Sequence, residues 1–283
     1  MKLIADHLTY KYNKGDAGEV TALDDVSFVV NEGDMIGLIG HTGSGKSTLV
    51  QILNGLLVPS LGTVYFDGED VFEKGYDRKK LRFKVGMVFQ YPEHQLFAET
   101  VYDDVCFGPK NMGLDKKEVA LRAFEALKLV GMEDEYFYQS PFDLSGGQKR
   151  RAAIAGILAM KPDIIILDEP TAGLDPAGRD KLLGQIRRLH DEKNITVIIV
   201  SHSMDDIANY TDRVIVMNKG KLLFDDKPLK VFEHIDELEE VGLAVPEVKY
   251  FMRDLKQAGL DVDEEIIGVN EAADKVAELY LKV

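Results

Sequence analysis

The feature that most restricts the fold of this chain is a glycine-rich segment, Gly40 to Ser47, with the sequence GHTGSGKS. It fits the pattern G-x-x-x-x-G-K-[ST] and lies between a strand-like run at 35–39 and a helix-like run at 47–53. In such a loop the backbone N–H groups turn towards phosphate oxygens, and the N-terminus of the next helix adds partial positive charge. The segment therefore predicts an α/β protein that binds the phosphates of a nucleotide.

Two side chains of this loop carry most of the predicted chemistry. Lys46 is expected to neutralise the β- and γ-phosphates of ATP, and Ser47 to place its hydroxyl on Mg²⁺. The residues expected to hold ATP here are Gly40, His41, Thr42, Gly43, Ser44, Gly45, Lys46, Ser47 and Thr48. An accidental glycine-rich turn is the alternative, and the flanking strand and helix patterns count against it.

The order of the apolar patterns predicts an α/β core with two additional parts, a β-subdomain and a helical insert. Short strand-like runs separated by turns, at 8–12, 26–30 and 63–66, predict an antiparallel β-subdomain. Apolar residues then recur at steps of three and four from about 100 to 160, which predicts a helical insert. Strand-like runs return at 164–167 and 196–200, as expected for a parallel sheet covered on both faces.

The chain changes character after about Pro228. Residues 229–283 hold 14 Asp and Glu against 6 Lys and Arg, a difference of −8 out of the total of −15. We therefore expect a nucleotide-binding domain over 1–228 and a small extension over 229–283. An apolar stripe there, ended by Gly259, predicts an amphipathic helix: Val248, Phe251, Met252, Leu255 and Ala258. We expect it to be exposed on a single chain and to bury against a partner, although a helix that only covers its own core would have the same pattern.

Composition excludes several classes of protein. A net charge of −15 argues against a nucleic-acid partner, because duplex binding depends on Lys and Arg. The single cysteine, Cys106, excludes an internal disulfide framework and is expected to be a small buried side chain. The first residues lead into strand-like sequence without the pattern of a secretory signal, and the longest aliphatic runs, such as 164–167, are strand-sized. Any membrane role is therefore expected to be peripheral.

Two adjacent carboxylates, Asp168 and Glu169, follow the strand-like run 164–167. In open α/β folds ligands bind at the carboxyl ends of the strands, so this pair is a candidate for metal and acid–base chemistry. Taken alone, a pair at this position is also compatible with two solvated surface residues. Gln90 and His202 follow two further strand-like runs and are candidates for the same edge of the sheet.

The pentapeptide LSGGQ, Leu144 to Gln148, is the sequence that marks ABC ATPases, and here the chain resembles that family. The resemblance implies a P-loop NTPase fold of the ABC ATPase type. It also implies that the loop serves the γ-phosphate of ATP held by a partner subunit, through Ser145, Gly146, Gly147 and Gln148. Nucleotide would then hold two chains together head to tail.

The same resemblance assigns roles to the strand-end residues. Asp168 is similar to the carboxylate that holds Mg²⁺, and Glu169 to the general base that deprotonates the attacking water. Gln90 is similar to a neutral ligand of Mg²⁺ and the water, and His202 to the histidine that hydrogen-bonds the γ-phosphate. Every catalytic element is present, which predicts a competent ATPase site.

Two further positions are implied by the family. Asp175 ends the sequence AGLD, which resembles the loop that crosses the dimer interface, although the family form usually begins with serine where this chain has Ala172. Tyr12 occupies the place of the aromatic residue on which adenine stacks. A tyrosine on an ordinary strand face is the alternative for Tyr12.

The run YPEHQLF at 91–97, followed by 100–105 and 107–111, resembles the ATPases of energy-coupling factor transporters, and His41-Thr42 fits their second ATPase type. Such proteins drive uptake of vitamins or metal ions at the cytoplasmic face of the cell membrane. The resemblance implies a heterodimer with a related ABC ATPase, with a homodimer also possible. It further implies a transmembrane coupling protein and a membrane-embedded substrate-binding component.

Two other functions are compatible with parts of the pattern. A non-transport ABC ATPase of DNA repair or chromosome organisation would share the fold and the hydrolytic residues. Such proteins carry long coiled coils or basic surfaces, and this chain has neither pattern. A regulatory module that binds ATP without hydrolysing it would be expected to lack Glu169 or His202, and both are present.

Overall fold

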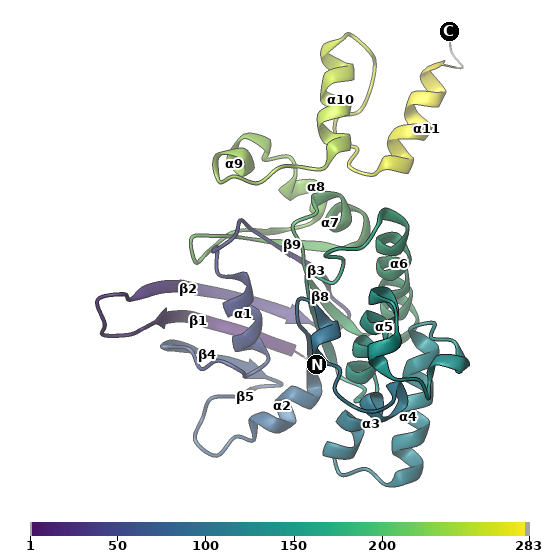
Figure 1. Cartoon of the computed structure of the whole chain (residues 1–283). Coiled ribbons are helices and arrows are strands. Elements are labelled where there is room, and N and C mark those ends of the chain that lie inside the picture. Colours follow the sequence, from purple (N-terminus) through teal and green to yellow (C-terminus); the bar gives the residue numbers. More distant parts are fainter. Residues whose placement is uncertain (1, 281–283) are drawn as a thin grey trace.

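The computed structural model describes residues 2–280 and contains two sheets (Figure 1). The first sheet is antiparallel with the strand order β2-β1-β4-β5. Its strands are β1 Lys2–Tyr12, β2 Val20–Asn31, β4 Leu61–Phe66 and β5 Glu69–Asp70. Leu3, Ala5 and Leu8 of β1 are buried, so one face of this sheet packs on the core. The antiparallel β-subdomain predicted from the sequence is confirmed.

The second sheet has the strand order β10-β9-β3-β8-β7-β6. Its strands are β3 Met35–Ile39, β6 Val85–Val88, β7 Ile164–Asp168, β8 Thr196–Val200, β9 Arg213–Asn218 and β10 Lys221–Asp226. All neighbours are parallel except β9 and β10, which form an antiparallel hairpin. The carboxyl ends of β3, β6, β7 and β8 therefore meet at one edge.

The β9–β10 hairpin was absent from the sequence prediction. Its two-residue turn consists of Lys219 and Gly220, both with positive φ (47° and 80°). Positive φ at both central positions is the requirement of a type I′ turn, whose twist matches the flanking strands. The sequence signal was the pair of short apolar runs, 214–217 and 222–224, on either side of this Lys-Gly pair.

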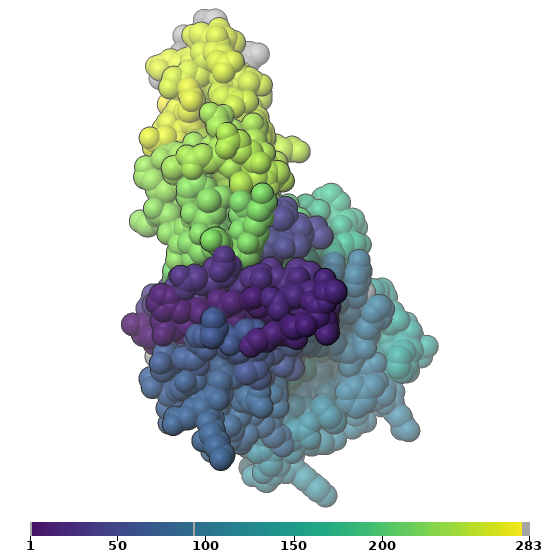
Figure 2. Space-filling model, turned by 90° about the vertical axis from the view of Figure 1, so that its left-hand side faces the viewer, coloured from purple at the N-terminus to yellow at the C-terminus, as the bar shows by residue number. Residues whose placement is uncertain are grey.

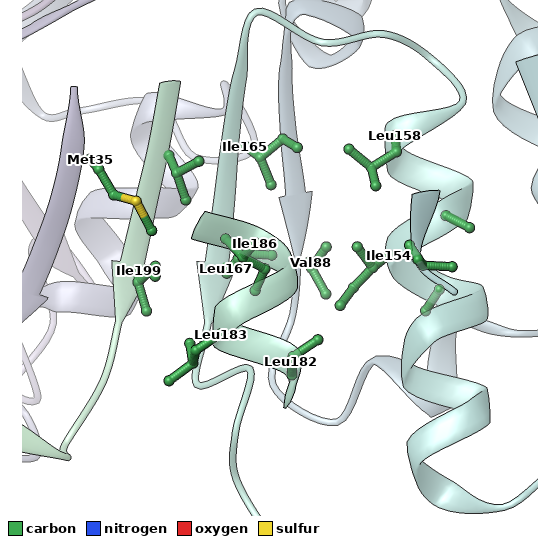
Figure 3. Close-up of a cluster of buried hydrophobic side chains, with 14 of the residues drawn as sticks. Met35, Val88, Ile154, Leu158, Ile165, Leu167, Leu182, Leu183, Ile186 and Ile199 are labelled. Atoms are coloured by element: carbon green, nitrogen blue, oxygen red, sulfur yellow. The ribbon is translucent and has the colours of Figure 1, made fainter. Parts of the chain in front are cut away.

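Alternate residues of the central strands face two separate cores. Ile164 and Ile166 pack with α1 (Lys46–Leu53) and the antiparallel sheet, whereas Ile165 and Leu167 pack with the helices on the other side. Figure 3 shows Ile165, Leu167 and Ile199 of this second core beside side chains of α5 (Gly146–Leu158) and α6 (Pro176–Lys193). The helices α1 and α5 consequently lie on opposite faces of the six-stranded sheet.

The stretch predicted to be helical between about 100 and 160 is helical in the structure. It contains α3 (Val101–Asn111), α4 (Lys116–Leu129), two single-turn 3₁₀ helices at Asp134–Tyr136 and Pro141–Asp143, and α5. Three shorter helices lie elsewhere in the nucleotide-binding part: α2 (Arg78–Lys84), a 3₁₀ turn at Pro92–Gln95 and α7 (Met204–Tyr210). Within residues 2–280, no helix has the length and apolar character needed to cross a membrane.

The last part of the described chain projects away from both sheets (Figures 1 and 2). It contains α8 (Pro228–Val231), α9 (Ile235–Glu240), α10 (Glu247–Gln257) and α11 (Val269–Tyr280). Phe232, Leu238 and Val245 belong to the large core, so the beginning of this segment is anchored on the main body.

The apolar stripe of α10 differs from the prediction. The helix forms and Gly259 follows its end with a φ of 89°, as expected for a C-terminal cap. Val248 and Met252, however, are buried within the chain, in a small core with Val262, Ile266 and Ala272. Phe251 remains 50% exposed. The stripe is therefore not exposed as a whole on a single chain, because Val248 and Met252 belong to the extension's own core.

The two phenylalanines of this segment allow a test of how it is anchored. Phe232 is fully buried in the large core, whereas Phe251 is half exposed on α10. We predict that Phe232→Ala lowers the free energy of unfolding by about 3 kcal/mol or more, because it leaves a cavity in a packed core. Phe251→Ala should cost less than about 1 kcal/mol. Urea unfolding of both variants measures the difference, and equal losses would contradict this packing.

Candidate nucleotide and hydrolysis site

The glycine-rich loop connects β3 to α1 and depends on glycine at two crowded positions. Gly40 has a φ of 155°, and a Cβ there would lie 2.4 Å from the carbonyl oxygen of Met217. Gly45 has a φ of 105°, and its Cβ would lie 2.5 Å from the carbonyl oxygen of Ala22. Real Cβ atoms do not approach so closely, so any other residue would displace the loop.

The loop closes around the amine of Lys46. This side chain is only 6% exposed, and its Nζ donates hydrogen bonds to the carbonyl oxygens of Gly40 (2.6 Å) and His41 (3.1 Å). Burial lowers the pKa of Lys46, while Glu169 and Asp168 oppose that change. The amine is thus held inside the loop as a local positive charge in an otherwise acidic chain.

Neighbouring elements fix the outside of the loop. The backbone N–H of Gly220, in the β9–β10 turn, donates to the carbonyl oxygen of Ser44 at 3.0 Å. His41 Nε2 lies 3.2 Å from Asn218 Oδ1. The β9–β10 hairpin, which the sequence analysis did not predict, therefore stabilises the position of the glycine-rich loop.

Tyr12 lies beside the start of α1. Its hydroxyl is hydrogen-bonded to the hydroxyl of Thr48 at 3.0 Å, and the residue is 41% exposed.

Asp168 and Glu169 stand at the carboxyl end of β7, next to this loop. Burial raises the pKa of Asp168, opposed by Lys46 and by a hydrogen bond from Ser47. Glu169 has a left-handed backbone (φ 51°), which is uncommon outside glycine and marks a tightly constrained position. Burial, reinforced by Asp168, raises the pKa of Glu169 to about 7. A carboxylate poised near neutrality can exchange a proton at physiological pH.

His202 lies opposite Glu169, two residues beyond β8. Its Nε2 is 3.1 Å from Glu169 Oε1, and its backbone N–H hydrogen-bonds the same carboxylate. Burial, with Lys46 acting in the same direction, lowers the pKa of His202. Gln90, also two residues beyond its strand, is exposed at the same edge, because β6 pairs in parallel with β7. One edge of the sheet thus presents the loop lysine, both carboxylates, His202 and Gln90.

The second glycine-rich loop caps α5. Ser145 is the N-cap, and Gln148 Oε1 accepts hydrogen bonds from the backbone N–H and the hydroxyl of Ser145, both at 2.8 Å. Cβ atoms added at Gly146 and Gly147 would meet nothing within 4 Å, so the backbone there is open to a ligand. Because α5 and α1 cover opposite faces of the sheet, the chain does not bring this loop to its own glycine-rich loop.

Asp175 is the N-cap of α6. Its Oδ1 accepts a hydrogen bond from the backbone N–H of Gly178 at 2.7 Å and so caps α6. Arg150 on α5 donates to the carbonyl oxygen of Ala172 at 2.9 Å, which ties the second glycine-rich loop's helix to the segment leading to Asp175.

Sequence reasoning missed one buried carboxylate near this edge, Asp206 on α7. It is 6% exposed and contacts Thr171 and Arg179. The signal in the sequence was the spacing of Ser203 and Asp206, which fits a helix N-cap directly after His202. That spacing could have placed Asp206 in a first turn, but not its contacts across the fold.

The raised pKa of Glu169 predicts a pH dependence of stability in the nucleotide-free chain with a metal chelator present. The ordinary pKa of 4.5 rises to about 7 on folding, so the unfolded chain releases this proton at lower pH. Glu169 therefore costs stability progressively as pH rises through this range. From pH 5 to pH 8, Glu169→Gln should gain on the order of 2 kcal/mol relative to the wild type in urea unfolding. Exposed Glu240→Gln is the control, and an equal pH response would contradict the assignment.

Comparisons with known proteins agree with this geometry. The family model described as ABC transporter matches residues 23–172. The chain is 49% identical to the energy-coupling factor transporter ATP-binding protein EcfA2 of Clostridium tetani, over 99% of this chain and 98% of that protein. It is 47% identical to the EcfA2 protein of Clostridium perfringens, again over 99% and 98%.

Two solved structures are similar over most of the chain. One is cbiO1 of Clostridium perfringens, part of the ABC transporter complex cbiONQ, with a TM-score of 0.75, 38% identity and coverage of 89% of this chain and 98% of that one. The other is a dimeric ATP-binding cassette in a post-hydrolysis state bound to ADP and Pi, with a TM-score of 0.71, 31% identity and coverage of 80% and 98%. The chain belongs to the ABC transporter family, among the ATP-binding proteins of energy-coupling factor transporters.

Proposed function

We propose that this chain binds and hydrolyses ATP as one subunit of an energy-coupling factor transporter. The observation that carries the proposal is the Glu169–His202 pair, 3.1 Å apart, at the same strand edge as the loop that encloses Lys46. A proton acceptor with a pKa near 7 beside a phosphate-binding loop is the arrangement that hydrolysis of a phosphoanhydride requires.

The nucleotide is held by the loop from Gly40 to Thr48. Backbone N–H groups of the loop and Lys46 bind the phosphate oxygens, and the exposed ring of Tyr12, hydrogen-bonded to Thr48, offers a face for adenine. On binding, the Lys46 amine exchanges its two loop carbonyl partners for phosphate oxygens. This exchange keeps the buried charge satisfied in both states.

The residues present fit Mg²⁺, which prefers oxygen ligands and retains several waters. The Ser47 hydroxyl and the Asp168 carboxylate are hydrogen-bonded to each other beside Lys46, so one oxygen from each can serve such an ion directly or through water. When bound, Mg²⁺ would neutralise charge on the phosphate oxygens. Gln90 supplies a neutral amide oxygen at the same edge.

In the hydrolytic step Glu169 accepts a proton from the attacking water. A hydrogen bond from the His202 backbone N–H keeps this carboxylate oriented, and the His202 ring, with its lowered pKa, is suited to hydrogen-bond the γ-phosphate as a neutral donor. The left-handed backbone of Glu169 is a constrained conformation, which suits a residue whose position must be fixed.

We further propose that each nucleotide is completed by a second chain. The loop at Ser145–Gln148 presents open backbone at a helix N-terminus, yet lies on the opposite face of the sheet from the nucleotide loop. Only another subunit can bring such a loop to the γ-phosphate, with Asp175 near the interface. The dimeric cassette found among similar structures is in keeping with this arrangement. A related ATPase is the expected partner, and a second copy of this chain is the alternative.

The remaining partners are proposed to lie in the membrane, with this chain at its cytoplasmic face. Phe97 and Phe107 are 60% and 48% exposed and pack edge to face, with their ring centroids 4.8 Å apart. Asp104, 8% exposed, fixes this segment by accepting hydrogen bonds from the backbone N–H groups of Phe97 and Ala98. An ordered apolar surface in the segment that follows Gln90 suits a coupling protein's helix. That protein would act with a substrate-binding component for a vitamin or metal ion.

Glu169→Gln tests the hydrolytic assignment. The amide cannot accept the water's proton but keeps the size of the side chain, so we predict retained ATP binding, accumulation of nucleotide-bound dimers and turnover reduced by at least about 100-fold. Steady-state ATPase assays and size-exclusion chromatography with ATP measure both effects. Exposed Glu240→Gln is the matched control, and undiminished hydrolysis by Glu169→Gln would remove Glu169 from its role.

A cysteine at position 97 tests the membrane contact. In a variant that lacks Cys106, Phe97→Cys should form crosslinks to the transmembrane coupling protein in the assembled complex, because this side chain is exposed on the proposed contact surface. Tyr138→Cys, at a residue 67% exposed on the helical insert but outside this segment, is the control. Crosslinking that is absent at 97, or equal at both positions, would contradict the proposed contact.

A further inference from the structure

We propose that Asp206 is a positioning residue for hydrolysis, which holds the segment after Glu169 and the turn after His202 in a single arrangement. The inference rests on the proposed function, because it concerns how the Glu169–His202 pair is kept in place. Asp206 acts through its neighbours, not through contact with the nucleotide.

One side of the Asp206 carboxylate is joined to the segment after Glu169. Its Oδ2 accepts a hydrogen bond from the hydroxyl of Thr171 at 3.4 Å, and Arg179 Nε lies 3.8 Å from the same oxygen. Thr171 is two residues beyond Glu169, and Arg179 lies in the first turn of α6. The carboxylate therefore holds the segment between β7 and α6 near both of its ends.

The other side of Asp206 is joined to the turn after His202. The backbone N–H of Asp206 donates to Ser203 Oγ at 3.3 Å, and the Ser203 side chain also hydrogen-bonds the Asp206 carboxylate. Ser203 directly follows His202, and its own backbone N–H donates to Ser201 Oγ at 3.0 Å. One carboxylate is thus the common partner of the two segments that carry Glu169 and His202.

The burial of Asp206 indicates a specific requirement for its charge. The residue is 6% exposed, and burial raises the pKa of its carboxyl group. A buried charge is costly unless it is paired and hydrogen-bonded, and Thr171, Arg179 and Ser203 provide those partners. Asn at this position would keep an acceptor for Thr171 but lose the attraction to Arg179, so the two segments would be held less firmly.

The adjacent carboxylate, Asp205, provides a matched control on the same helical turn. Its Oδ1 accepts a hydrogen bond from the backbone N–H of Glu247 at 3.1 Å, at the start of α10. Asp205 thus joins α7 to the extension, whereas Asp206 joins α7 to the hydrolytic segments. Both substitutions to Asn remove one acidic charge from α7 and differ in the contact that they weaken.

The test uses the full chain in its assembled transporter and measures steady-state ATP hydrolysis. We expect Asp206→Asn to lower kcat at least about tenfold with KM for ATP within about twofold, because small displacements of reacting groups affect the chemical step more than binding. Asp205→Asn should retain wild-type kcat. Thr171→Val should lower kcat, and Thr171→Ser, which keeps the hydroxyl, should restore it. Combining Asp206→Asn with Thr171→Val should cost no more than the larger single effect.

Each result bears on one of the two proposals. A wild-type complex without ATPase activity would contradict the proposed function. With an active wild type, an Asp206→Asn variant that matches Asp205→Asn, or one whose loss is entirely in KM, would overturn the positioning role. Should Asp206→Asn fail to fold, as judged by circular dichroism, the comparison of Thr171→Val with Thr171→Ser decides the question, and equal kcat values for these two would contradict the inference.

Discussion

The structure depends on the parallel register of β6, β7 and β8. Val88 pairs with Leu167, and Asp168 pairs with Val200, so the residues that follow these strands emerge at one level. Gln90, Glu169 and His202 come from segments far apart in the chain, yet the register alone brings them to the same edge. A slip of one residue in β7 would reverse its faces, exchange the cores of Ile165 and Ile166, and move Glu169 away from His202.

The second governing constraint is the burial of charge. Lys46, Asp168 and Glu169 are largely removed from water. Both carboxylates oppose the lowering of the Lys46 pKa, Lys46 opposes the raising of theirs, and Asp168 raises the pKa of Glu169 further. Isolated ions would be costly in such surroundings, but the lysine amine between loop carbonyls and two carboxylates is compensated. For Glu169, burial and the neighbouring Asp168 carboxylate disfavour the charged form more than Lys46 and the His202 backbone N–H favour it, and this accounts for its pKa near 7. The Glu169 carboxyl group can therefore be either protonated or ionised near neutral pH, as a proton acceptor requires.

Sequence reasoning predicted the parts of the fold that have local signals. The nucleotide loop, the central strands and the helical stretch follow from motifs and apolar periodicity over a few residues. The β9–β10 hairpin was missed, although its Lys219-Gly220 turn was visible. The exposure of Val248 and Met252 was predicted wrongly, because a helical stripe does not say whether its partner is another chain or, as here, Val262 and Ile266. The contacts of Asp206 could not be predicted, since they join residues whose proximity exists only in the folded chain.

The capping box at Ser145 has a consequence for how two chains would meet. Because Gln148 is already hydrogen-bonded to the backbone and hydroxyl of Ser145, the glycine-rich turn is ordered before any anion arrives. Little conformational entropy remains to be lost when a phosphate docks there. The loop would then bind a neighbour's nucleotide without a change in its own conformation. The association rate of the two chains would be set by encounter and alignment, not by loop ordering.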